Sequence, residues 1–179
     1  MTEMLTCLLL PLQEKALILP SSAIAEIISF ERPKLIPDIP KWLVGISTWR
    51  GIQIPLTHLE DMESHLVLSE SPQHEAEVQD LKHHVAVINR VNKIQNEAQV
   101  PTGDKYPFFS IVLKSVPKLY HLTQESIKLV SQFPENENSR YLMEVKVKND
   151  YAFVPNLPSL WKMIDALPSR LQWFRQIII

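Results

Sequence analysis

Short apolar or alternating segments, typical of β-strands, occupy most of the chain. They predict strands over residues 5–12, 16–19, 84–91, 108–116, 119–122, 140–147 and 151–155, with turns at 13–14 and 149–150. Two segments have the spacing of a helix instead. One is residues 20–30, where Ser21 or Ser22 could cap a short helix, and the other begins at residue 156. The pattern therefore predicts a mainly β protein with few helices.

The segment GISTWRGIQIPL, residues 45–56, contains two of the three glycines in the chain. Isoleucines at alternate positions flank the second glycine, which predicts a strand, a tight Arg50–Gly51 turn and a second strand. A bend of this kind either presents Trp49 and Arg50 to a partner or uses them to hold another part of the fold.

The linking segments differ in composition from the strands. Residues 31–40 hold three prolines and predict an extended loop. No Lys or Arg lies between Arg50 and Lys82, while seven acidic residues do, which predicts a solvated, mobile acidic loop at about 63–82. We expect that loop to be dispensable for stability.

The end of the chain carries an apolar stripe with helical spacing. Its members are Leu167, Leu171, Phe174 and Ile178. We therefore expect a single domain over residues 1–165 and a C-terminal helix over 166–179 that docks on the domain or on a partner.

Two stretches about a hundred residues apart resemble each other. IQIPLTHLEDM and AFVPNLPSLWKM each show a strand that ends in an aliphatic residue and Pro, followed by leucines that open a helical turn. Such an echo favours two similar β lobes.

Composition restricts the classes of function. A net charge of -2 gives no basic field for nucleic acid, and no apolar run is long enough to insert in a bilayer. The N-terminal apolar stretch lacks the basic region of a signal peptide, and Cys7 is the only cysteine. We expect a soluble protein of a reducing cytosol, without disulfides.

Candidate catalytic and metal-binding residues are few. His83 and His84 are neighbours on a predicted strand and face opposite sides, so they cannot chelate one metal ion. Cys7 lies within a strand, and three scattered glycines cannot build a phosphate cradle. A carboxylate–histidine site near the acidic loop is conceivable, but its spacing matches no metal motif; its histidines would be His58, His65 and His74. We expect no catalytic residue, cofactor or metal, and a module that binds other proteins.

One longer motif resembles a known family. The pattern V-x-E-I, a proline-containing loop and then G-V-x-N-L-R-G-x-V-x-P-V-x-x-L is the signature of CheW-like domains. Here it appears as IAEI at residues 24–27 and IPDIPKWLVGISTWRGIQIPLTHL at 36–59. The segment IVLKSVPKLYHLTQESIKLV at 111–130 resembles the second half of the family less specifically, and the likeness extends over residues 5–164.

The resemblance implies a CheW-like fold of two SH3-like β-barrel lobes, with short helices and a C-terminal helix. It implies a non-catalytic scaffold that links the cytoplasmic tips of chemoreceptors to the regulatory domain of a CheA-type histidine kinase in bacterial chemosensory signalling. Such a protein works in the cytoplasm, at membrane-associated receptor arrays. The receptor would bind in the groove between the lobes, and the kinase would contact apolar strand-edge surface at the end of a lobe.

The expected partner-binding residues are the matched motif positions together with Trp49, which precedes Arg50, and Glu26, which could pair with it. They are Ile24, Glu26, Gly45, Trp49, Arg50, Val116 and Leu119.

Each position also has a structural alternative. Ile24 could belong to the core, Gly45 could serve a close backbone approach, and Trp49 could anchor the lobes to each other. An ion pair with Glu26 could hold Arg50 in place, although an exposed pair contributes only ~0–1 kcal/mol.

The chain also departs from the family pattern. Ser47, Thr48 and Trp49 replace the usual residues before Arg50, and Lys114 and Ser115 replace others in the second half. These departures resemble divergent members of type IV pilus (twitching) systems. An alternative function is a stand-alone β-barrel adaptor or an oligomeric structural protein unrelated to kinase arrays.

Overall fold

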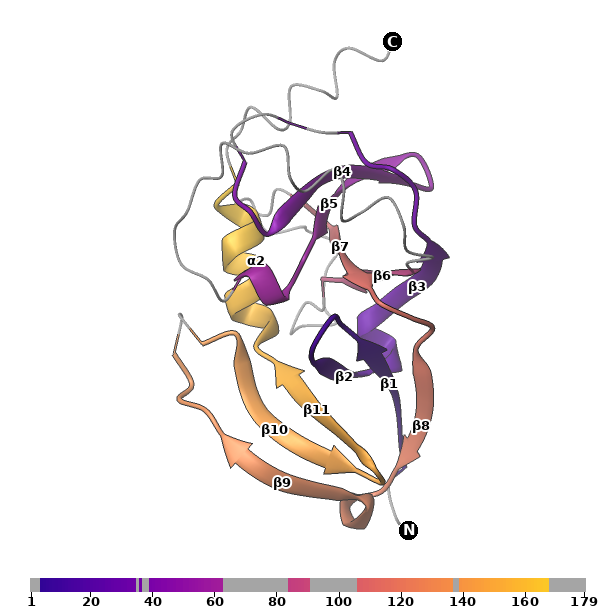
Figure 1. The fold of residues 1–179 in the computed structure, drawn as a ribbon, viewed down its shortest axis with the longest axis vertical. Helices are drawn as coiled ribbons and strands as arrows, with labels where there is room; N and C mark the ends of the chain where they lie inside the picture. The colour runs from indigo at the N-terminus through magenta and orange to yellow at the C-terminus, as the bar shows by residue number, and fades with distance from the viewer. Residues whose placement is uncertain are drawn as a thin grey trace, which may run out of the picture.

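Two β-sheets and one short helix make up the described part of the computed structural model, which covers residues 4–34, 36, 39–62, 84–90, 106–136 and 139–167 (Figure 1). The six-stranded sheet has the order β8-β1-β2-β11-β10-β9. Its strands are β1 (Leu5–Pro11), β2 (Ala16–Pro20), β8 (Lys118–Leu122), β9 (Ile127–Gln132), β10 (Tyr141–Val147) and β11 (Asp150–Pro155). The predicted mainly β architecture is confirmed.

The five-stranded sheet has the order β3-β6-β7-β5-β4. Its strands are β3 (Ile24–Ser29), β4 (Leu43–Trp49), β5 (Ile52–Thr57), β6 (His84–Asn89) and β7 (Phe108–Leu113). Short 3-10 turns and one α-helix complete the fold: η1 (Ser21–Ala23), η2 (Glu60–Met62), η3 (Gln124–Ser126) and α2 (Leu157–Asp165). Each sheet with its flanking turns is one lobe.

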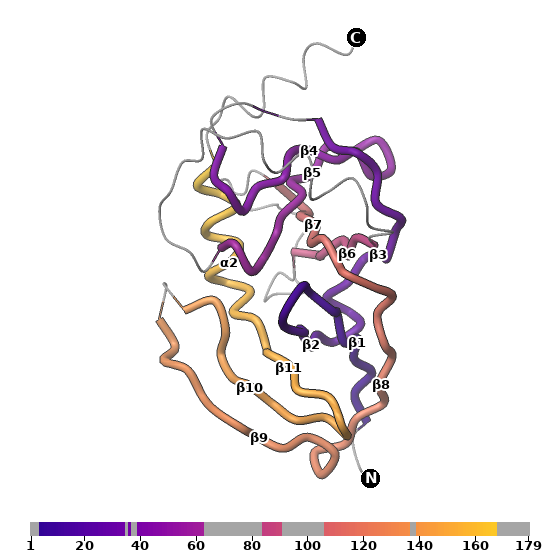
Figure 2. Tube along the Cα trace, in the orientation of Figure 1, coloured from indigo at the N-terminus to yellow at the C-terminus, as the bar shows by residue number. Residues whose placement is uncertain are grey.

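The two N-terminal strands belong to the lobe that is otherwise built from the end of the chain. β1 pairs with β8, and β2 pairs in parallel with β11. Figure 2 shows this crossing, with the indigo N-terminal trace between the orange and yellow strands. The lobes are therefore interlocked through the chain and are not two consecutive units.

The main hydrophobic core lies between the lobes. Alternate residues of β6 pack on opposite faces of their sheet: Ala86 and Ile88 join the core shared with β1, β2 and α2, whereas Val85 and Val87 pack in clusters on the other face. A separate cluster fills the six-stranded sheet and contains Cys7, Leu9, Ile18, Leu122, Val145, Val147 and Ala152. Because successive residues of a strand point to opposite faces, β1 and β2 are buried on both sides: Leu9 and Ile18 lie in this cluster, whereas Leu10 and Leu17 lie in the main core.

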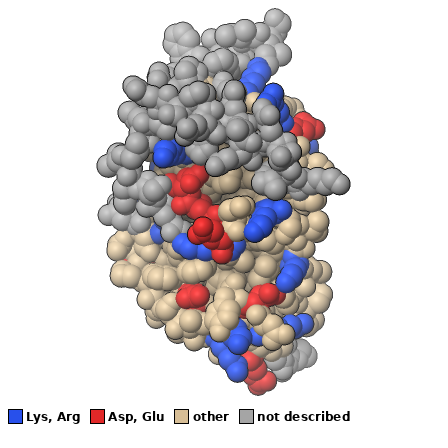
Figure 3. Space-filling view, in the orientation of Figure 1, with Lys and Arg blue, Asp and Glu red and all other residues tan. Residues whose placement is uncertain are grey.

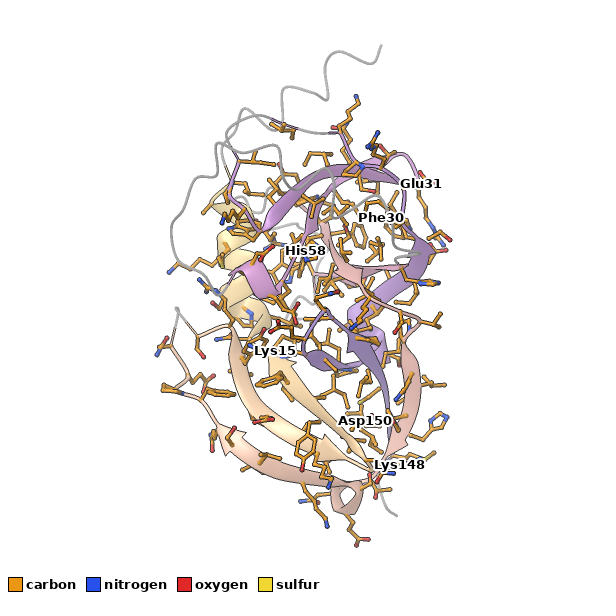
Figure 4. All side chains as sticks on the ribbon, viewed as in Figure 1. Lys15, Phe30, Glu31, His58, Lys148 and Asp150 are labelled. Carbon is orange, nitrogen blue, oxygen red and sulfur yellow. The ribbon has the colours of Figure 1, made fainter. Side chains whose placement is uncertain are left out.

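The six-stranded sheet curls so that its edge strand β8 meets the β10–β11 turn. The Tyr120 hydroxyl donates to Asp150, and the Lys118 Nζ lies 3.1 Å from an Asp150 carboxylate oxygen. Figure 4 shows Asp150 and Lys148 at the end of the molecule where these strands converge. The Tyr120 hydroxyl and Lys118 lower the pKa of Asp150, and the same hydrogen bond raises the pKa of Tyr120.

Glu60 in η2 ties the five-stranded lobe to the β1–β2 turn. Its carboxylate accepts backbone N–H bonds from Gln13, Glu14 and Lys15 at 3.1, 2.9 and 2.8 Å. Arg90 after β6 makes a bidentate pair with Asp165 at the end of α2, at 3.1 and 2.6 Å. These contacts fix the turn and the helix against the five-stranded sheet.

Two expectations about the elements are wrong. Residues 20–30 form the 3-10 turn η1 and strand β3 instead of a helix, and no side-chain cap from Ser21 or Ser22 is made. The pairing of β3 with β6 determines the extended conformation. The last hairpin turns at residues 148–149, one position earlier than expected, and Lys148 adopts a positive φ of 54° there.

Strand β9 was not predicted: the expected strands end at residue 122 and resume at residue 140. Helix α2 begins after Asn156, whose side chain accepts from Ser159 N at 3.3 Å.

The expected acidic loop at 63–82 and the C-terminal stripe beyond Leu167 lie outside the described residues, whereas Leu167 itself is buried in the main core.

Candidate functional site

The β4–β5 hairpin turns on two residues, Arg50 and Gly51. Trp49 pairs with Ile52, and the two turn residues have positive φ angles of 48° and 76°. This is the pattern of a type I′ turn, in which both central residues are left-handed. A left-handed conformation costs a non-glycine residue roughly 1–2 kcal/mol, so Arg50 occupies the bend at an energetic cost.

Trp49 is buried beside this turn and bonded to strand β3. The residue is 9% exposed and packs in one cluster with Ile54 and Val87. Its ring meets the Phe108 ring edge-on, with the ring centres 4.8 Å apart. The indole Nε1 donates to the Glu26 Oε2 at 2.8 Å. The indole N–H therefore has a partner in a position with little access to water.

A β-bulge in β3 positions Glu26 for this bond. Ile24 pairs with Ile88, but the next paired residue is Glu26, opposite Val87, so that Ala25 is the extra residue. Residues two apart normally share a face of a strand, and a bulge breaks that rule. Ile24 consequently packs on the main core, while Glu26 reaches the face that carries Trp49.

Arg50 bonds to the same carboxylate oxygen. Its Nε and Nη2 lie 3.2 and 3.1 Å from the Glu26 Oε2, and its guanidinium lies 5.1 Å from the Trp49 ring centre. The Arg50 side chain is 67% exposed and that of Glu26 is 38% exposed. Glu26 thus orients the guanidinium but leaves most of it accessible, in a form suited to a planar anionic or carbonyl partner.

The three residues also join opposite edges of the five-stranded sheet. β3 and β4 are the two outer strands of that sheet. Glu26 lies on β3 and Trp49 is the last residue of β4, so their hydrogen bond connects the two edge strands of the five-stranded sheet. We call Glu26, Trp49 and Arg50 the hairpin clamp.

Gly45 serves the close approach of another segment. Lys34 and Ile46 exchange backbone hydrogen bonds of 3.0 and 3.2 Å, and a Cβ on Gly45 would collide with the Lys34 backbone oxygen. Gly45 also has a φ of 155°. The glycine allows the segment after β3 to lie against β4. This close approach explains why a glycine occupies position 45 without any direct contact with a partner.

Val116 and Leu119 lie in the other lobe, at the start of its edge strand β8. They are 63% and 57% exposed. Leu119 pairs with Leu8, and Leu8 packs on the main core. Ile24 of β3 packs on the same core. Figure 1 shows β3 and β8 along the same side of the molecule. The expected site residues therefore form two groups, the hairpin clamp with Ile24 and Gly45 in one lobe, and Val116 with Leu119 in the other.

The described ranges show neither a cluster of metal ligands nor an activated cysteine. No group of three or more His, Cys, Asp or Glu side chains there could hold a metal ion. Burial raises the pKa of the Cys7 thiol, which makes the thiolate less accessible. Among the helices that the structure describes, none has the length and apolar character needed to cross a bilayer.

Sequence reasoning missed two contributors to this site, Phe108 and the bulge at Ala25. Phe108 comes from a strand more than fifty residues after the hairpin, and only its contact with Trp49 identifies it. The bulge has no local signal, since AIAEI is compatible with an unbroken strand or a helical face.

Comparisons with known proteins agree with this architecture. The family model for the CheW-like domain matches residues 6–95. Among solved structures, the scaffolding protein TtCheW from Thermoanaerobacter tengcongensis is similar, with a TM-score of 0.56, 13% sequence identity, and coverage of 87% of this chain and 90% of that chain. No match is found among curated proteins.

Proposed function

This chain belongs to the CheW-like domain family, and from that membership we propose that it is a non-catalytic coupling protein of bacterial chemosensory signalling. In this proposal it joins the cytoplasmic tip of a chemoreceptor to the regulatory domain of a CheA-type histidine kinase. It acts in the cytoplasm, at membrane-associated receptor arrays, and uses no cofactor or metal.

The hairpin clamp is the observation that carries the proposed receptor contact. Arg50 occupies a left-handed turn position that glycine or asparagine would fill at lower cost, and its side chain stays 67% exposed. A stabilising role alone explains this poorly, because an exposed ion pair with Glu26 contributes only ~0–1 kcal/mol. Recognition of a receptor group by the oriented guanidinium explains both the position and the exposure.

We assign the remaining expected residues to the same contact. Val116 and Leu119 offer exposed apolar surface to the receptor, and Trp49 and Glu26 hold the guanidinium. Ile24 and Gly45 support this surface without touching the receptor. Ile24 packs on the main core, and Gly45 lets the Lys34 backbone lie against β4. The kinase contact on strand-edge surface and the type IV pilus output stay predictions. The pilus output rests only on the departures from the family pattern near Trp49 and at Lys114 and Ser115.

The test is the affinity for a purified fragment of a receptor's cytoplasmic tip. Arg50→Ala should weaken binding by roughly 2–5 kcal/mol if the contact is desolvated. Arg50→Lys should restore only part of that loss, because an ammonium cannot form the bidentate fork. Thermal melting of both variants should change little, since most of the side chain is exposed.

Arg32→Ala is the matched control, because Arg32 is an exposed arginine outside the clamp. It should bind like the parent protein. Unchanged receptor affinity in Arg50→Ala, with a lowered melting temperature, would make Arg50 a structural clamp and contradict the proposed contact.

A further inference from the structure

Strand β9 forms an open edge of the six-stranded sheet. In the described part of the chain it pairs with β10 alone, so its other side presents backbone N–H and C=O groups without a strand partner. Two apolar side chains in the middle of this edge, Leu129 and Val130, are 61% and 48% exposed. An open edge with exposed apolar residues is suited to strand addition by another chain.

A register shift singles out Val130. Leu129 pairs with Val145 and Ser131 pairs with Glu144, which leaves Val130 as the extra residue of a bulge. Val130 therefore has no partner on β10, although it is 48% exposed.

The outward face beside this edge carries an unusual row of residues. Lys128 of β9 pairs with Lys146 of β10, which in turn pairs with Tyr151 of β11. We call these three residues the lysine ladder. They lie on the face away from the buried Val145 and Val147, and Tyr151 is 54% exposed.

The lysine ladder is not neutralised within the described chain. Like charges directly opposite each other on paired strands are unfavourable. Lys146 Nζ lies 5.2 Å from the centre of the Tyr151 ring, but no described carboxylate forms an ion pair with Lys128 or Lys146. Glu144, one step along β10, accepts instead from the Ser131 hydroxyl at 3.2 Å.

Charges elsewhere on the surface are mixed. Figure 3 shows basic and acidic side chains interspersed over the described part of the face that it draws. Lys118, at the other edge of the same sheet, is paired with Asp150. The two ladder lysines without an ion pair are therefore a local feature of this surface, and they leave room for carboxylates of another chain.

We propose that the β9 edge binds an extended acidic segment of a partner protein. The segment adds a strand next to β9, and its apolar side chains cover Leu129 and Val130. Its carboxylates lie on the face that carries Lys128 and Lys146, with Lys128 as the nearer partner. A second copy of this chain fits less well, because it would bring further lysines to a face that already carries Lys128 and Lys146. This surface is separate from the proposed receptor contact and does not depend on it.

A blocked hexapeptide of alternating valine and glutamate is the probe, titrated into isotope-labelled full-length protein and followed by NMR. We expect saturable shifts of the β9 amides that weaken when the salt concentration is raised, since exposed charges are screened. A hexapeptide of alternating valine and lysine should not bind. Equal binding of the two peptides, or no binding of either, would overturn the proposal.

The double variant Lys128→Glu and Lys146→Glu tests the ladder directly. It should bind the glutamate peptide at least tenfold more weakly and gain affinity for the lysine peptide, whereas Lys41→Glu, an exposed lysine of the other lobe, should behave as the parent. Receptor-tip affinity should not change in the double variant, so failure of either proposal can be recognised by itself. A dimer in sedimentation that is lost in Leu129→Asp would assign the edge to a second copy and contradict the acidic partner.

Discussion

Removal of the Glu26 carboxylate should separate the two roles of the hairpin clamp. Glu26 accepts from two donors that differ in exposure: Trp49 is 9% exposed, and the Arg50 side chain is 67% exposed. Both donors use the same oxygen, Oε2. Glu26→Ala deprives both of their acceptor, whereas Glu26→Gln keeps a carbonyl oxygen for the indole and removes only the charge.

The magnitudes follow from burial. A buried donor left without an acceptor costs about 1–3 kcal/mol, and this is the expected loss for the indole N–H. Loss of the exposed charge pair costs ~0–1 kcal/mol. We therefore expect Glu26→Ala to lower the free energy of unfolding by about 2 kcal/mol and Glu26→Gln by less than about 1 kcal/mol. For a chain of this size each kcal/mol corresponds to about 2–4 °C in Tm.

Urea denaturation and thermal melting of both variants measure these losses. Glu31→Ala is the matched control, because Glu31 is an exposed acid in the segment that follows β3. Trp49→Phe removes the N–H but leaves the carboxylate, and its double-mutant cycle with Glu26→Ala isolates the indole–carboxylate coupling. If Glu26→Gln is as damaging as Glu26→Ala, the charge and not the hydrogen bond to Trp49 dominates, and the reasoning from burial is refuted.

Two further predictions concern a backbone approach and a carboxylate. Gly45→Ala should destabilise the protein more than Gly51→Ala: both positions have positive φ, but a Cβ at 45 meets the Lys34 backbone, whereas one at 51 meets open space. Urea denaturation checks the order, and an equal loss at both sites would contradict it. Asp150→Asn should cost stability at neutral pH, and the difference from the parent should shrink as the pH falls below about 3.9, because the lowered pKa of Asp150 stabilises the fold only while the carboxyl is ionised. Melting curves between pH 7 and pH 2 test this, and a difference independent of pH would refute it.

The local parts of the fold were accessible from the sequence. The Arg50–Gly51 turn was predicted because its signal, a glycine between alternating isoleucines, lies within a few residues. The same holds for β1 and β2 with their turn, and for α2 after Asn156. The CheW-like assignment was also predictable, because its most specific motif is the same hairpin.

The parts that were missed depend on partners distant in sequence. Isoleucines at 24, 27 and 28 fit one face of a helix as well as a bulged strand, and the pairing with β6, some sixty residues later, decides between them. Strand β9 likewise owes its conformation to β10. The hydrogen bond from Trp49 to Glu26 follows from the bulge, so sequence reasoning could suggest an Arg50–Glu26 pair but not the indole as a second donor.

The interlocked lobes affect the order in which the chain can fold during synthesis. β1 and β2 leave the ribosome before the other described strands, yet their outer neighbours β8 and β11 follow about a hundred residues later or more. At ordinary elongation rates of ~5–20 residues per second, the apolar N-terminal hairpin waits roughly 5–25 seconds before the strands that cover its two edges have been made. Contacts so distant in sequence also slow folding, because a long loop must close before they form. The nascent chain is thus vulnerable to aggregation through the open edges of β1 and β2 until β8 and β11 have been made.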